Sequence, residues 1–103
     1  MSLLIHAAIP ERKHFASNAL AAFREACLAS IDLDLSHAIF YRLLAEHANH
    51  LLDAYHQVPL EVAVTDRDFK EFKELIAMAE EAVDQSAERQ LAAANAMARA
   101  SFF

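Results

Sequence analysis

Apolar residues recur every three or four positions over three long stretches of the chain, which is the pattern of amphipathic helices. The predicted helices cover residues 10–29, 35–57 and 66–100. Pro10 suits the first position of a helix, where its missing N–H is no loss. The pattern predicts an all-α fold, a three-helix bundle with a long C-terminal helix, in a single domain over residues 1–103.

Two segments outside these helices are also apolar. Residues 1–9 form an apolar N-terminal segment, and residues 58–64 alternate apolar and polar positions and are rich in valine. Alternation of this kind is typical of a β-strand, so residues 3–5 could pair with 58–64 in a two-stranded ribbon. A packed loop is the other interpretation, and the one we favour.

The side chains on the apolar face of the third predicted helix become smaller half-way along the helix. Its apolar face begins with bulky residues such as Phe69 and Ile76 and continues mainly with alanine, Leu91 and Met97. An unbroken helix would be roughly 52 Å long, against about 30 Å for the first two. We therefore expect its C-terminal turns to extend beyond the bundle and to pack on a second subunit or another protein. A kink near residues 85–86 that folds the tail back as a fourth helix is the alternative.

The overhanging turns supply the predicted partner-binding surface, because exposed apolar surface usually marks a binding site. Used twice in a symmetric pair, the same surface predicts a homodimer. Charged replacements on this face are expected to abolish association and leave helicity intact. The residues of this surface are Leu91, Ala94, Met97, Phe102 and Phe103.

Composition excludes several classes of function. The 103 residues include no glycine and two prolines, which rules out the glycine-dependent phosphate loops. The net charge is −6, and the longest basic run is residues 12–14. Direct binding to nucleic acid needs a clustered basic surface, so we expect none.

Cysteine usage and the start of the chain point to a cytoplasmic protein. Cys27 has no second cysteine to pair with, and its place on an apolar helix face predicts a buried, structural thiol. The apolar N-terminal segment has no positive flank and is too short to span a bilayer. We expect no membrane association.

Six histidines make a metal site worth testing. Glu46, His47 and His50 lie at helical spacing on the second predicted helix, and bundles build metal sites from such pairs on facing helices. The facing helices offer no matching ligands on their apolar sides, so we predict no metal, no cofactor and no catalytic residue. A metal- or ligand-binding bundle using these three residues remains the alternative.

The stretch from Phe40 to Tyr55 is similar to the small nucleoid-modulating helical proteins of enteric bacteria, but it contains no diagnostic motif, and we infer neither family nor function from it. The whole pattern favours a small, acidic, non-enzymatic regulatory or adaptor protein. Such a protein covers a surface on a partner protein, as inhibitors, antiactivators and chaperones do.

Overall fold

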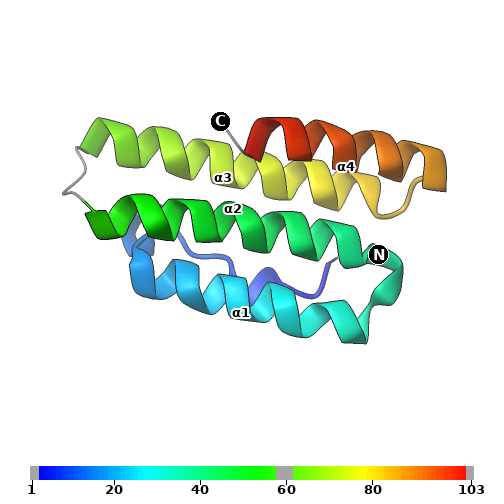
Figure 1. The fold of residues 1–103 in the computed structure, drawn as a ribbon, viewed down its shortest axis with the longest axis horizontal. Coiled ribbons are helices and arrows are strands. Elements are labelled where there is room, and N and C mark those ends of the chain that lie inside the picture. The colour runs from blue at the N-terminus through cyan, green and yellow to red at the C-terminus, as the bar shows by residue number, and fades with distance from the viewer. Residues whose placement is uncertain (1–2, 58–61, 102–103) are drawn as a thin grey trace.

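The computed structural model describes residues 3–57 and 62–101, and within them the chain is a bundle of helices without β-strands (Figure 1). The prediction of an all-α fold is confirmed. The α-helices are α1 (Ser17–Leu33), α2 (Ala38–Gln57), α3 (Val62–Ala82) and α4 (Ala87–Ser101). Short 3₁₀ turns are η1 (His6–Ala8), η2 (Arg12–His14) and η3 (Leu35–His37).

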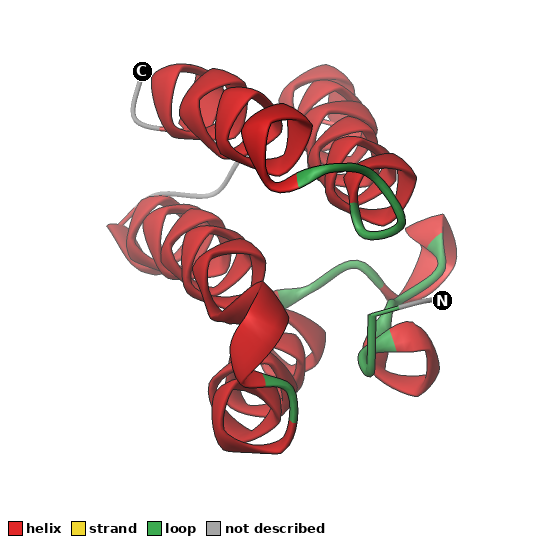
Figure 2. Cartoon of the chain, turned by 90° about the vertical axis from the view of Figure 1, so that its right-hand side faces the viewer, coloured by secondary structure: helices red, strands yellow, loops and turns green. Residues whose placement is uncertain are grey.

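The helices form two antiparallel hairpins that lie on each other, α1 with α2 and α3 with α4 (Figure 1). Helix α2 is central, because it packs against α1, α3 and α4. Seen end-on, the N-terminal segment lies at the edge of the bundle between α1 and α3 (Figure 2). Both tight connections, α1 to α2 and α3 to α4, are at the same end of the molecule.

The predicted continuous helix over residues 66–100 is wrong, and the kinked alternative is what the structure contains. Local hydrogen bonds explain the break. The Ser86 hydroxyl accepts the N–H of Arg89 at 3.3 Å and so caps the new helix. The Gln90 amide donates to the carbonyls of Val83 at 3.1 Å and of Gln85 at 3.0 Å.

Folding α4 back also buries the apolar face that an overhang would leave in water. Met97 is fully buried, and Ala94 is buried beside it in the same core. The longest dimension of the molecule is 41 Å, shorter than the roughly 52 Å of the unbroken helix. Burial within one chain therefore replaces the predicted burial against a partner.

Helix α1 begins at Ser17, not at Pro10, because tertiary packing redirects the chain before it. Phe15 is inserted among the aromatic rings of the other helices, with its ring centroid 5.1 Å from Phe69 and 6.1 Å from Tyr55. Arg12 forms an ion pair with Asp66 near the start of α3. Phe15 and Arg12 thus both contact α3 from the segment that precedes α1.

The other boundaries differ from prediction by a turn or less. Helix α1 continues to Leu33, and α2 begins at Ala38 because the residues before it form η3. Helix α3 already begins at Val62, so residues 62–64 are helical and not extended. Residues 58–61, the rest of the predicted ribbon strand, lie outside the described part of the chain.

The N-terminal segment is part of the core. Leu3 and Ile5 are each 1% exposed, whereas Leu4 between them faces water. The segment thus fills the edge between α1 and α3 with alternate side chains. No helix in the described ranges has the length and apolar character needed to cross a membrane.

Candidate functional site

The turn between α1 and α2 reverses the usual distribution of polar and apolar side chains. Leu33 and Leu35 are 77% and 71% exposed, although leucine normally belongs inside. Asp34 and His37, from the same turn, point into the bundle and are largely shielded. The polar residues are inside and the leucines outside, so this turn is the first candidate for a functional surface.

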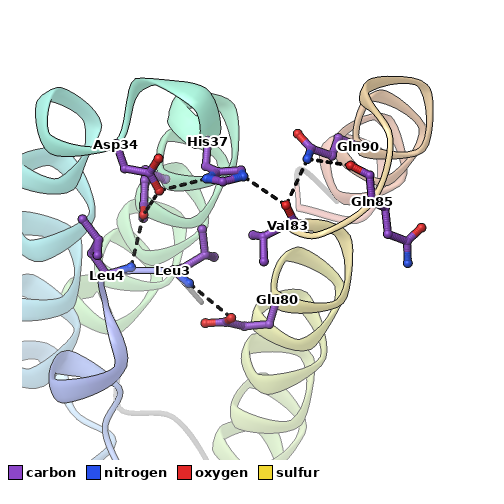
Figure 3. Close-up of polar contacts among 9 residues, drawn as sticks. Leu3, Leu4, Asp34, His37, Glu80, Val83, Gln85 and Gln90 are labelled. Carbon is purple, nitrogen blue, oxygen red and sulfur yellow. Dashed lines mark hydrogen bonds and ion pairs between the residues drawn. The ribbon is translucent and has the colours of Figure 1, made fainter. Parts of the chain in front are cut away.

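Hydrogen bonds hold the two inward polar residues in place (Figure 3). One carboxylate oxygen of Asp34 lies 2.9 Å from His37 Nδ1, and the same oxygen accepts a hydrogen bond of 2.8 Å from the Tyr41 hydroxyl. The bonds from His37 and Tyr41 hold the pKa of Asp34 below its ordinary value of 3.8. Burial raises the pKa of Tyr41 to about 12, so its hydroxyl remains a donor at neutral pH.

His37 links this turn to the far end of α3. Its Nε2 lies 3.2 Å from the carbonyl oxygen of Val83, which can only accept. Each ring nitrogen of His37 therefore lies within hydrogen-bond distance of an oxygen atom, one from Asp34 and one from Val83. Gln90 of α4 donates to the same Val83 carbonyl, so this oxygen, one residue after the end of α3, is shared by the α1–α2 turn and α4.

The N-terminal segment is attached to the same network. The backbone N–H of Leu4 donates to the Tyr41 hydroxyl at 3.1 Å, and the N–H of Leu3 donates to Glu80 at 3.3 Å. His6 Nε2 lies 3.1 Å from the other Glu80 carboxylate oxygen. Tyr41 therefore connects the N-terminal segment with Asp34 of the α1–α2 turn, and Glu80 connects the segment with α3.

Two more large apolar side chains are exposed at this end of the bundle. Ile39, in the first turn of α2, is 51% exposed, and Leu91, in the second turn of α4, is 63% exposed. Both helices start at the end that carries the α1–α2 turn (Figure 1). We call Leu33, Leu35, Ile39 and Leu91 together the apolar end.

The predicted partner-binding residues do not form one face in the described part of the chain. Leu91 is exposed and belongs to the apolar end, whereas Ala94 and Met97 are interior residues of the chain's own core. Phe102 and Phe103 lie outside the described residues. The prediction that Leu91, Ala94 and Met97 lie on one helix is confirmed, but α2 and α3 of the same chain cover Ala94 and Met97.

The predicted histidine cluster separates in the structure. His47 is buried, Glu46 is partly buried, and His50 is exposed. Burial, assisted by the neighbouring His50, lowers the pKa of His47 to about 4, so the ring is neutral at pH 7. Over residues 3–57 and 62–101, no three His, Cys, Asp or Glu side chains are close enough together to hold a metal ion.

His47 instead forms part of the wall of a cavity of about 190 Å³, shared with Glu71, Glu74 and residues of α3 and α4. The sequence did not indicate this partnership, because both glutamates lie on the polar side of α3. Helix α4 adds Ala100 to the wall of the cavity, and both glutamates remain exposed. The reversed α1–α2 turn was likewise not predicted from the sequence.

Cys27 is buried in the core, as predicted for a structural thiol. Burial raises its pKa to about 12. A thiol with so high a pKa is almost wholly protonated at neutral pH and is a poor nucleophile.

Comparison with known proteins finds no matching family model, no similar curated protein and no similar solved structure.

Proposed function

We propose that this chain is a non-enzymatic adaptor or regulatory protein, and that it binds a partner protein through the apolar end. The observation that carries the proposal is the reversed pattern of the α1–α2 turn. Leu33 and Leu35 face water, whereas Asp34 and His37 of the same segment face the interior of the bundle.

The free energy of that arrangement argues for a partner. Leaving a leucine exposed forgoes roughly 1.5–3 kcal/mol that burial would contribute. Single exposed leucines are common and need no explanation, but Leu33, Leu35 and Ile39 lie within seven positions, from the end of α1 through η3 to the start of α2. A grouped apolar surface marks a protein contact more often than an accident of folding.

Rigidity supports the same proposal. Binding costs less when the contacting side chains are already held in position. The hydrogen bonds of Asp34 to His37 and Tyr41 fix the backbone that carries Leu33 and Leu35. The turn is therefore suited to insert two leucines into an apolar groove on the partner.

The test compares Leu35→Asp with Ala77→Asp. Both place one new carboxylate at an exposed position, the first at the apolar end and the second in the middle of α3. With tagged proteins and capture from the cells that make the protein, we expect Leu35→Asp to lose at least about tenfold of the captured partner. Ala77→Asp should capture the wild-type amount, and both variants should unfold at the wild-type temperature.

Equal capture by Leu35→Asp and Ala77→Asp would contradict the proposal. Sedimentation velocity on the same proteins tests whether the partner is a second copy of the chain. A wild-type dimer that Leu35→Asp dissociates would identify the apolar end as a homodimer contact.

A further inference from the structure

His47 is a polar side chain placed inside the bundle without a polar partner. It is 4% exposed, and neither ring nitrogen has a hydrogen-bond partner among residues 3–57 and 62–101. Its ring is stacked on Phe72, with centroids 6.2 Å apart and planes inclined by 20°. Buried polar groups in native proteins are nearly always hydrogen-bonded, so this imidazole calls for an explanation.

The cavity beside His47 offers one. Three helices form its wall: α2 supplies His47, α3 supplies Glu71, Glu74, Leu75 and Met78, and α4 supplies Ala100. Its volume of about 190 Å³ is roughly ten times what one ordered water needs. Both ring nitrogens are shielded as the ring stands. Rotation of a histidine ring about the Cβ–Cγ bond is soft, and such a rotation would bring one nitrogen toward the cavity.

The charges around the cavity favour a cation. Glu71 and Glu74 are exposed carboxylates at its mouth, and its described wall includes no lysine or arginine. Ala100 belongs to the last turn of α4, where carbonyl oxygens without intrahelical partners carry a partial negative charge. Arg99 in that turn is exposed and is not a wall residue.

The remaining wall is apolar, which distinguishes an organic cation from a metal ion. Leu75 and Met78 suit a short hydrocarbon chain. Met78 also borders a second, separate hollow of about 210 Å³ between α3 and α4, whose wall includes both Glu81 and Arg89. A metal ion would need several ligands at short distances, and the described residues bring no such group together.

We propose that this cavity binds a small organic ammonium ion, with the ammonium group between His47 and the carboxylates of Glu71 and Glu74 and the hydrocarbon part against Leu75 and Met78. The neutral imidazole, whose pKa burial lowers to about 4, can accept a hydrogen bond from the ammonium group without repelling it. This site lies on the α3–α4 side of α2 and does not depend on the protein contact proposed above.

The experiment is an NMR titration of the isotope-labelled protein with n-butylammonium chloride, with 1-butanol and sodium butyrate as uncharged and anionic comparators. We expect saturable shifts at the amides of Leu75, Met78 and Ala100 and at the His47 ring with the ammonium ion. Butanol should bind more weakly by up to about fivefold, which is the upper end of what an exposed ion pair contributes, and butyrate more weakly still.

Matched variants locate the site. Glu74→Gln should weaken butylammonium binding about fivefold, whereas Glu88→Gln, on the exposed face of α4, should leave it unchanged. His47→Leu keeps the core apolar, so it should fold and yet bind more weakly than wild type. Equal binding of butanol and butylammonium, or equal affinities of Glu74→Gln and Glu88→Gln, would overturn the proposal, and so would an absence of saturable shifts at the cavity.

Discussion

His47 shows at the residue scale how a position that weakens the fold can mark a site. An unsatisfied buried polar group costs about 1–3 kcal/mol, and His47 presents two ring nitrogens without partners in the described structure. Replacing such a residue by an apolar one of similar size is often neutral or stabilising. The imidazole therefore needs a reason other than stability, and the cavity on which it borders supplies one.

The pKa of His47 leads to a prediction about acid stability. Its folded value of about 4 lies below the ordinary value of 6.5, so between these values the unfolded chain binds more protons than the folded one. The free energy of unfolding should therefore fall as the pH drops from 6.5 to 4, by roughly 3 kcal/mol over the whole range. Urea unfolding followed by circular dichroism at several pH values measures it.

The control for that prediction is the histidine one turn further along α2. His47→Leu should flatten the stability profile between pH 6.5 and 4 and raise the free energy of unfolding at pH 7 by about 1–3 kcal/mol. His50→Leu, at an exposed position, should retain most of the slope, because burial lowers the pKa of His47 more than His50 does. Asp34 acts at lower pH, because its pKa lies below 3.8 in the folded state, and its contribution is lost only as the pH falls through that lower value. A slope that survives in His47→Leu would place its origin elsewhere.

At the element scale, α4 shows what local periodicity can and cannot settle. Leu91, Ala94 and Met97 recur at helical spacing, as the sequence indicates, but this spacing does not determine which surface covers them. The hydrogen bonds of Ser86 and Gln90 end α3 and begin α4, which returns to pack on α2 and α3. Two of the three residues become core, and Leu91, which the turn of the helix leaves outside, stays on the surface.

A matched pair on α4 tests this assignment. Met97→Ala should lower the free energy of unfolding by about 2–5 kcal/mol, because it leaves a cavity in the core. Leu91→Ala should change it by less than about 0.5 kcal/mol, as is usual for an exposed position. Urea denaturation of both variants provides the comparison. Similar effects for the two would mean that α4 does not pack as described, and an overhanging helix would again fit better.

At the scale of the whole molecule, the N-terminal segment covers one edge of the bundle. Helices α1 and α3 meet through Phe23 and Phe72, whose ring centroids are 4.8 Å apart, and the segment lies at the edge between the two helices (Figure 2). Alternate side chains point inward, so Leu3 and Ile5 are buried and Leu4 is not. Its backbone is anchored by Tyr41 of α2 and Glu80 of α3.

Neighbouring residues of this segment should therefore differ sharply in their effect. Ile5→Ala is expected to destabilise the protein by roughly 2–4 kcal/mol, a large share of the 5–15 kcal/mol typical of a folded domain. Leu4→Ala should cost less than about 1 kcal/mol. Thermal unfolding followed by circular dichroism distinguishes the two cases. A loose N-terminal tail would make both replacements harmless.

The sequence by itself determined the local features of this protein. Helical periodicity, the absence of glycine and the single cysteine were sufficient to predict an all-α bundle, an approximate second helix and the burial of Cys27. These features depend on each residue and its neighbours three or four positions away, and such information is present in any short window of the chain.

Only the tertiary structure decided where α4 packs, what the N-terminal segment covers and which polar groups meet. His37 and Val83 are 46 positions apart, and His47 shares a cavity with residues of α3 and α4. Contacts of that separation depend on how whole helices pack, and several packings bury the same stripes equally well. Both proposed sites arise from such contacts: the reversed turn is held by a bond to Val83, and α4 adds Ala100 to the wall of the cavity.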